Sequence, residues 1–247
     1  GILIDNGQTT TIENTTVTGS SETNIYIDGE PITRSVVITN VVASQSQNGD
    51  GIAAVATPEQ DTITLTNISA VGNNDDGLDI GTAVLNLDQS TVNGNGDIGI
   101  IATPDRANIT RSSVQNNGDN GIQFLSLGTE ATVSLNSILG NGEAAVVNDQ
   151  EGVTVDAQNN WWGTASGPSE ADIVGDVNTN AALASPPGPN GAINPAAVTV
   201  EPTEQTSVGI QLEGARNGVT AYQFDLSVAN SSVANISAIN ATNDPEF

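Results

Sequence analysis

Hydrophobic residues recur along residues 1–184 in short alternating runs. Each run is followed by a turn rich in Asn, Gly and Asp, and then by a glycine and an aliphatic residue. Seven segments follow this pattern, and they begin at Ile12, Ile38, Leu65, Leu87, Ile109, Val133 and Val155. Successive starts lie roughly 22 to 27 residues apart, and regular spacing of this size indicates an internal repeat. Most of the steps are at the short end of that range, so the predicted unit has about 22 residues.

The composition of the repeat indicates strands and turns. Its segments are rich in β-branched residues and are broken by Gly and Asn every few positions, as strands and tight turns are. Helical repeats would need longer runs rich in Ala, Leu, Glu and Lys. A leucine-rich repeat has a similar period, but its fixed leucines are absent. The prediction is an all-β fold, a parallel β-helix whose coils stack at the strand spacing of about 4.8 Å.

The register of the repeats predicts which side chains stack. The seven start residues are expected to form one inward stack. A second stack is expected five positions later, at Val17, Ala43, Ala70, Val92, Val114 and Ile138. Polar residues lie two positions after five of the starts, at Asn14, Asn40, Asn67, Gln89 and Arg111. Strand alternation predicts that they point inward, where amides could bond in a ladder.

The chain is expected to begin inside a coil. Gly1-Ile2 precedes the start at Ile12 by nearly the same spacing as Gly77-Leu78 precedes the start at Leu87. Because a bare coil end would expose unpaired strand edges, we expect further coils or a cap upstream.

The pattern changes after residue 184. Residues 185–196 are rich in Pro, Gly and Asn and are predicted to be a linker. Residues 197–247 alternate between apolar and polar positions, as half-buried strands do. About 50 residues are too few for a complete β-sandwich of about 100, so a truncated sandwich is predicted there.

Charge and composition exclude several classes of function. The chain has 29 acidic residues against four arginines, and it has no Lys, His, Cys or Met. Disulfides and cysteine-based metal sites are therefore excluded, and the commonest general base is missing. Nucleic acid is not an expected partner, because phosphate binding needs several basic residues. A net charge of −25 repels itself unless salt screens it, which favours a salt-adapted protein. No run is long enough to insert into a membrane.

Two segments resemble known families. The run Asn160-Trp161-Trp162-Gly163, followed by Gly167-Pro168, resembles the closing motif of right-handed parallel β-helix proteins, the superfamily of the pectate lyases and the NosD-like periplasmic proteins. This resemblance covers residues 1–184 and implies a right-handed solenoid. Residues 217–228 resemble the early strands of cohesin-like domains on surface proteins of halophilic archaea. That resemblance implies an extracellular or cell-surface location and a carbohydrate-binding type of sandwich.

The acidic turns are candidates for a calcium site. Asp75, Asp97 and Asp119 follow one another at the spacing of one repeat unit, and Asp50, Asp76 and Glu143 are expected one position nearer the following glycine. Stacked Asp and Asn oxygens suit a hard cation such as calcium. The alternative is a set of solvated turns, because Asn-Gly and Asp-Gly are good turn formers.

Catalytic candidates are few. Asp75 and Asp76, followed by Asp79, resemble the acidic motif of β-helix polygalacturonases, although that family's basic and His elements have no match. The superfamily's lyases combine calcium with a basic residue, and near the acidic turns only Arg106 and Arg111 are available. Asp75, Asp76 and Arg106 are therefore the catalytic candidates for a lyase or a hydrolase.

Trp161 and Trp162 are two of only seven aromatic residues. Adjacent strand residues point to opposite faces, so one indole is expected to cap the core and the other to face outward, where a sugar could stack. The function that we expect is a non-catalytic β-helix module that binds polysaccharide or surface glycan, within a protein that has other surface domains. The alternatives are a polysaccharide-degrading enzyme and a structural spacer.

Overall fold

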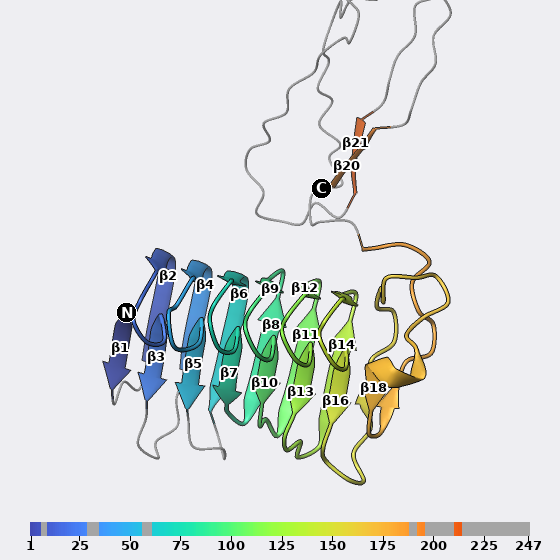
Figure 1. Cartoon of the computed structure of the whole chain (residues 1–247), viewed down its shortest axis with the longest axis horizontal. Helices are drawn as coiled ribbons and strands as arrows, with labels where there is room; N and C mark the ends of the chain where they lie inside the picture. Colours follow the sequence, from blue (N-terminus) through green and yellow to red (C-terminus); the bar gives the residue numbers. More distant parts are fainter. Residues whose placement is uncertain (6–8, 29–34, 56–60, 188–191, 196–209, 214–247) are drawn as a thin grey trace, which may run out of the picture. The chain divides into compact units, whose positions relative to one another are not determined.

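The computed structural model describes residues 1–5, 9–28, 35–55, 61–187, 192–195 and 210–213. Contacts divide the chain into two compact units, Gly1–Pro187 and Gly188–Phe247. The first unit is a parallel β-solenoid (Figure 1). In the second unit the described residues form an antiparallel pair, β20 (Ala192–Pro195) with β21 (Ile210–Glu213). No helix within the described ranges has the length and hydrophobicity needed to cross a membrane.

The unit boundary after Pro187 falls inside the segment predicted to be a linker, and β20 also begins there. The cohesin-like prediction concerns residues 197–247. Of these, Ile210–Glu213 alone belong to the described residues, and the rest of the prediction lies outside them.

One parallel sheet takes one strand from each coil. Among the described residues it has eight strands: β1 (Ile2–Asp5), β3 (Ile25–Asp28), β5 (Ile52–Val55), β7 (Leu78–Gly81), β10 (Ile100–Ala102), β13 (Ile122–Phe124), β16 (Val146–Asn148) and β18 (Ile173–Val174). Ile2 and Ile173 are joined through seven successive parallel pairings. A turn therefore averages about 24 residues, within the usual range of solenoid repeats. The shorter predicted unit holds for the middle coils, where Leu78 pairs with Ile100 and Ile100 with Ile122.

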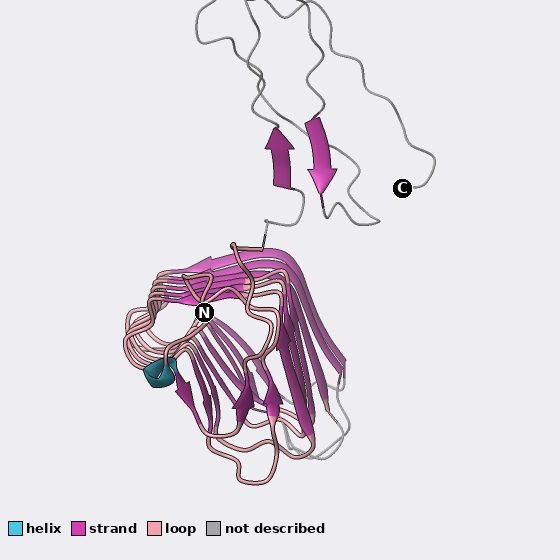
Figure 2. Ribbon diagram, turned by 90° about the vertical axis from the view of Figure 1, so that its right-hand side faces the viewer, coloured by secondary structure: helices cyan, strands magenta, loops and turns pink. Residues whose placement is uncertain are grey.

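The second sheet is bent along a line parallel to the solenoid axis (Figure 2). In the first three coils one strand runs through the bend: β2 (Thr9–Thr18), β4 (Ser35–Ser44) and β6 (Thr62–Val71). In later coils it divides into β8 (Val84–Asp88) and β9 (Thr91–Asn93), β11 (Arg106–Thr110) and β12 (Ser113–Gln115), and β14 (Glu130–Ser134) and β15 (Ser137–Leu139). The last strands are β17 (Val155–Asp156) and β19 (Val177–Asn178), and a 3-10 turn, η1 (Glu170–Asp172), precedes β18.

Aliphatic stacks fill the interior. The first predicted stack is confirmed from Ile12 to Val133, and the second is confirmed from Val17 to Ile138. The prediction that Val155 continues the first stack after Val133 was wrong. It pairs with Ala131, so Ala157 continues the stack of Val133. This coil is longer than the predicted repeat unit, and counting one unit on from Val133 therefore gives the wrong partner.

The predicted inward ladder of polar residues is also wrong in its direction. Asn14, Asn40, Asn67, Gln89 and Arg111 occupy the bend, each with a φ between 50° and 56°. Asn tolerates this left-handed conformation better than most residues. The conformation breaks strand alternation, so the side chains turn outward. The amides do bond to one another there, since Asn40 Nδ2 donates to Asn14 Oδ1 at 3.1 Å and Asn67 Nδ2 donates to Asn40 Oδ1 at 2.8 Å.

A buried asparagine ladder lies elsewhere, at the turn that precedes the eight-stranded sheet. Asn73, Asn95, Asn117 and Asn141 stack. The Nδ2 of each of the first three donates to the Oδ1 of the next at 2.9–3.0 Å, and Asn141 Nδ2 donates to the carbonyl of Val114 at 3.2 Å. Each Oδ1 that accepts also takes the backbone N–H of the preceding Asn. The ladder therefore satisfies the polar groups of successive turns inside the protein.

Candidate functional site

The acidic turns form one edge of the solenoid, which we call the acidic edge (Asp50, Asp75, Asp76, Asp97, Asp119 and Glu143). At its first coils one carboxylate oxygen from each of Asp50, Asp75 and Asp76 lies within 4.8 Å of the others. Asp50 Oδ1 accepts the N–H of Asp76 at 3.1 Å, and Asp76 Oδ1 accepts the N–H of Ile98 at 2.8 Å. The backbone therefore orients two of these carboxylates.

Further along, the acidic edge is a single row of carboxylates. The N–H of Asp97 donates to the carbonyl of Asp75 at 3.3 Å, and the N–H of Asp119 donates to that of Asp97 at 3.1 Å. Glu143 continues this row, because its N–H donates to the carbonyl of Asp119. The prediction that Glu143 shares the position of Asp50 and Asp76 was wrong. In the preceding coil Gly121 lies directly before the strand, and the N–H of Ile100 donates to its carbonyl. Ala145 takes this place in the next coil, since the N–H of Ile122 donates to its carbonyl. Glu143 therefore precedes Ala145 by two positions, as Asp119 precedes Gly121.

Burial and like charge perturb this edge. Burial raises the pKa of Asp76 to about 7, and the carboxylates of Asp50, Asp75 and Asp97 add to the rise. Burial also raises the pKa of Asp50, with further contributions from Asp75 and Asp79, and the pKa of Asp79, with a contribution from Asp75. At the other end, burial and Glu143 raise the pKa of Asp119. These carboxylates are therefore costly to ionise in the folded protein.

The first coils offer a cation the chemistry that it needs. Asp50, Asp75 and Asp76 provide oxygen donors, the type that calcium prefers, and a bound cation would replace like-charge repulsion with attraction. Asp97 and Asp119 do not join this group of three within the described part of the chain. The predicted five-residue calcium set thus divides into one cluster and one row.

Arg106 is not part of the acidic cluster. It lies on β11 of the bent sheet, where its Nε contacts Glu130 Oε1 at 2.8 Å. Asp75 and Asp76 precede β7 of the other sheet. The three catalytic candidates are therefore not brought into one site.

The two tryptophans point in different directions. Trp162 is 7% exposed and belongs to the hydrophobic core, where it follows Ile138 in the second stack, since Ser137 pairs with Trp161. Its place fits a cap, and it leaves no indole surface for a sugar. Trp161 is half-buried on the outside of the same coil, so it alone remains available for sugar stacking.

Trp161 ends a surface that we call the uncharged face. It consists of the outward side chains after the bend of the second, eleven-stranded sheet. One row contains Thr16, Val42, Ser69, Thr91, Ser113, Ser137 and Trp161. The neighbouring row contains Thr18, Ser44, Val71, Asn93, Gln115 and Leu139, of which Ser44 is buried. None of these thirteen side chains ionises, although the chain carries a net charge of −25.

Hydrogen bonds hold part of the uncharged face in place. Asn93 and Ser113 bond through their side chains at 3.2 Å, and Gln115 Nε2 donates to Ser137 Oγ at 2.9 Å. The face was missed from the sequence, although its first row lies four positions after each inward start residue up to Val133. Its hydroxyls recur with the coils and could have been found from that spacing.

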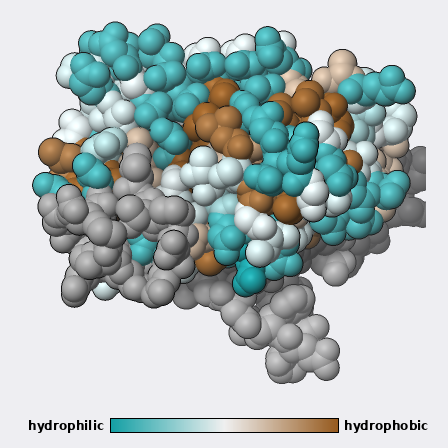
Figure 3. Space-filling view, turned by 90° about the horizontal axis from the view of Figure 1, so that it is seen from below, coloured by the Kyte–Doolittle hydropathy of each residue, from teal (hydrophilic) through white to brown (hydrophobic). Residues whose placement is uncertain are grey.

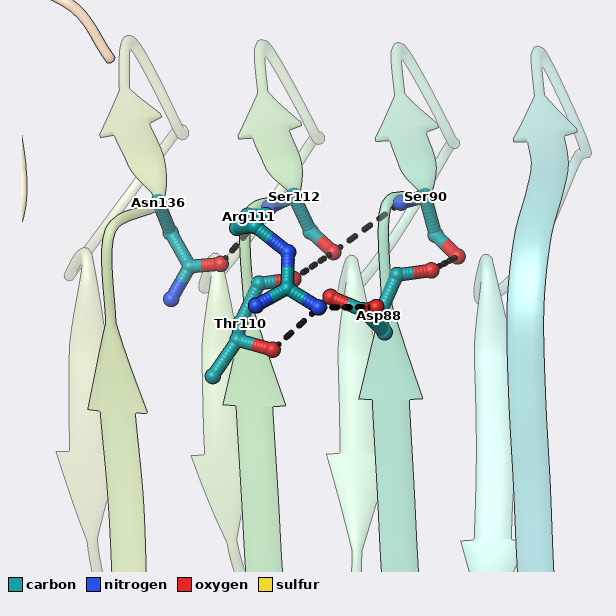
Figure 4. Close-up of polar contacts among 6 residues, drawn as sticks. All are labelled: Asp88, Ser90, Thr110, Arg111, Ser112 and Asn136. Carbon is teal, nitrogen blue, oxygen red and sulfur yellow. Dashed lines mark hydrogen bonds and ion pairs between the residues drawn. The ribbon is translucent and has the colours of Figure 1, made fainter. Parts of the chain in front are cut away.

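One ion pair borders the uncharged face at the bend (Figure 4). Arg111 Nη2 contacts Asp88 Oδ2, and Thr110 Oγ1 donates to Asp88 Oδ1 at 2.9 Å. The side chains of Arg111 and Asp88 are 20% and 26% exposed. Beside them, the N–H of Ser90 donates to Ser112 Oγ and the N–H of Ser112 donates to Asn136 Oδ1. This polar row fixes the backbone that carries the pair.

The side of the solenoid seen from below presents apolar atoms in separate patches between polar ones (Figure 3). The exposed large hydrophobic residues of the described ranges are Leu3, Leu125, Leu135 and Val174. They belong to separate strands and turns and do not form a continuous apolar groove.

Comparison with known proteins identifies one family. Residues 1–161 match the family described as "Right handed beta helix region". No curated protein matches the chain significantly, and neither does any solved structure.

Proposed function

The chain belongs to the right-handed β-helix family, and from that premise we propose that it is a non-catalytic module that binds polysaccharide or surface glycan. The observation that carries the proposal is the uncharged face, whose hydroxyl and amide groups alternate with a few aliphatic side chains and which ends at Trp161. Sugars offer many hydroxyls and an apolar ring face. Polar groups in fixed positions can form hydrogen bonds with the sugar hydroxyls, and an indole can stack on the apolar face of the sugar ring.

The location belongs to the same proposal. A surface rich in carboxylates, with no Lys and no Cys, fits a protein that works outside the cell or on its surface in concentrated salt. The resemblance of residues 217–228 to cohesin-like domains supports attachment to other surface-protein domains. Salt adaptation and an archaeal source are part of this proposal.

The binding proposal is tested by retention on a panel of neutral and acidic polysaccharides in molar salt, with release of new chain ends measured in the same samples. We expect retention without cleavage. Trp161→Ala should lower the affinity about tenfold, because losing ~50 Å² of apolar contact costs roughly 1.3 kcal/mol. Leu125→Ala is the matched control, since it removes an exposed apolar side chain just after β13 of the other sheet.

A second candidate function is polysaccharide hydrolysis at the acidic edge. It is favoured by Asp76, whose pKa of about 7 suits a general acid, and by the neighbouring carboxylates of Asp50 and Asp75, one of which would act as base or nucleophile. New chain ends that disappear in Asp76→Asn would establish this enzyme in place of the binding module. A protein that neither binds nor cleaves any of the panel would be a spacer.

A further inference from the structure

We propose that Asp88 makes the uncharged face selective for uncharged polysaccharides by neutralising Arg111. This inference rests on the proposed binding function and names the class of ligand. Asp88 would be a specificity-determining residue that acts through Arg111 and not by touching the sugar.

Arg111 lies at the border of the uncharged face. The bend residues form the border of the uncharged face, and in the described coils they are Asn14, Asn40, Asn67, Gln89, Arg111, Leu135, Asn159 and Ala181. Arg111 is the charged member of this row. A free guanidinium at the border would attract the carboxylates of an acidic polysaccharide, since its planar donors match a carboxylate.

Asp88 compensates the charge of Arg111. Asp88 holds the Arg111 guanidinium through Oδ2 and is itself held through Oδ1 by Thr110 (Figure 4). Both side chains are mostly covered, since Arg111 is 20% and Asp88 26% exposed, so the pair is screened less than a pair in open solvent. The pair presents no net charge to a ligand on the uncharged face.

The rest of the surface adds to this selectivity through its negative charge. With a net charge of −25, the protein repels acidic chains at low salt, and cationic groups in contact with the ligand would offset this repulsion. Both arginines of the described residues are paired with carboxylates, Arg111 with Asp88 and Arg106 with Glu130. An uncharged chain meets no such repulsion, so the face favours neutral sugars.

The test is a gain of binding in Asp88→Asn. The amide is isosteric and retains an oxygen for Thr110, but it leaves the guanidinium charge uncompensated. We expect affinity for an acidic polysaccharide, polygalacturonate, to rise about threefold at 0.15 M salt, which corresponds to one exposed ion contact. Affinity for the neutral polysaccharide that the wild type retains should stay the same. At 1 M salt the gain should shrink, because the Debye length falls to about 3 Å.

Glu130→Gln is the matched control. It makes the same change in charge and frees Arg106, which lies at the other end of β11, away from the bend. It should not raise binding to polygalacturonate. Arg111→Gln added to Asp88→Asn should abolish the gain, which shows that the guanidinium is the cause. Circular dichroism and thermal melting confirm that each variant is folded.

The outcomes separate this inference from the proposed function. If the wild type binds no polysaccharide, the proposed function fails. If it binds neutral chains but Asp88→Asn and Glu130→Gln change acidic binding equally, the binding function stands and the role of Asp88 is overturned. A wild type that binds polygalacturonate as tightly as neutral chains also overturns it.

Discussion

The acidic edge and the uncharged face are stacked by the same coils and differ in what they stack. On the acidic edge Asp97 follows Asp75 and Asp119 follows Asp97 through backbone bonds of 3.1–3.3 Å. On the uncharged face Ser113 follows Thr91 and Ser137 follows Ser113. The backbone spacing is the same, but hydroxyls gain partners at that distance whereas carboxylates repel one another. A solenoid therefore multiplies the chemistry of one repeat position, whether that chemistry is favourable or costly.

The two regions also differ in what lies beneath them. Under the acidic edge the buried ladder of Asn73, Asn95, Asn117 and Asn141 joins successive turns. Under the bend next to the uncharged face, the corresponding row consists of Ser90 and Ser112, followed by Asn136 and Asn160. Four successive amides support the acidic edge, where the carboxylates repel one another. Removing one of these amides tests whether the two regions differ in their support.

The largest effect is expected from Asn95→Ala. Asn95 Oδ1 accepts from the N–H and the Nδ2 of Asn73, and its Nδ2 donates to Asn117 Oδ1 and to the carbonyl of Ala70. The substitution leaves several buried polar groups unpaired, which costs about 3 kcal/mol of the free energy of unfolding. Urea denaturation measures this cost.

Gln115→Ala on the uncharged face is the control for Asn95→Ala. Gln115 Nε2 donates to one partner, Ser137, and the side chain is only half-buried, so the loss should be no more than about 1 kcal/mol. If the two variants lost equal stability, the buried ladder would not be what supports the acidic edge.

The second prediction concerns pH. Burial raises the pKa of Asp76 in the folded protein to about 7 from an ordinary 3.8, so between these values the folded state binds a proton that the unfolded state releases. The contribution of Asp76 to stability should therefore be fully present below about pH 3.8 and should be lost as pH rises through about 7. Solvent screening reduces this contribution to about 1–2 kcal/mol.

Asp76→Asn should flatten this decline, and thermal melting from pH 4 to pH 8 measures it. Glu22→Gln is the control for net charge, because it removes one exposed carboxylate from a turn. A decline of the same size in Asp76→Asn and in the wild type would exclude Asp76 as its source.

Calcium should stabilise the acidic edge, by less than the two effects above. A cation at Asp50, Asp75 and Asp76 would bind the folded state only. It should stabilise the protein by about 1 kcal/mol at a concentration several times its Kd, which is a rise in Tm of roughly 2–4 °C. Asp50→Asn should remove most of this rise, and Glu143→Gln should leave it unchanged. An equal response in both variants would indicate general screening of the acidic edge and not a site.

The repeat spacing predicted the solenoid well because the aliphatic stacks recur with the coils. The stacks from Ile12 to Val133 and from Val17 to Ile138 both follow from it. The spacing failed where side-chain direction depends on backbone conformation, since Asn14 and its successors turn outward at a positive φ. It also failed where coil length varies, at Val155 and Glu143. The uncharged face was not predicted, because Ser, Thr and Asn are abundant throughout the chain and their recurrence on one face depends on the coil register.

The smallest effect is expected from Glu130→Gln. This substitution breaks the ion pair with Arg106, which lies outside both the acidic edge and the uncharged face. The two side chains are 64% and 58% exposed, so water already solvates both charges, and ordering two long side chains offsets the attraction. The free energy of unfolding should change by less than about 0.5 kcal/mol, as measured by urea denaturation. Because the substitution also removes one negative charge from a protein of net charge −25, a clear gain in stability would show that repulsion is spread over the whole surface. No change would show that the cost of charge is concentrated where carboxylates are stacked and buried, on the acidic edge.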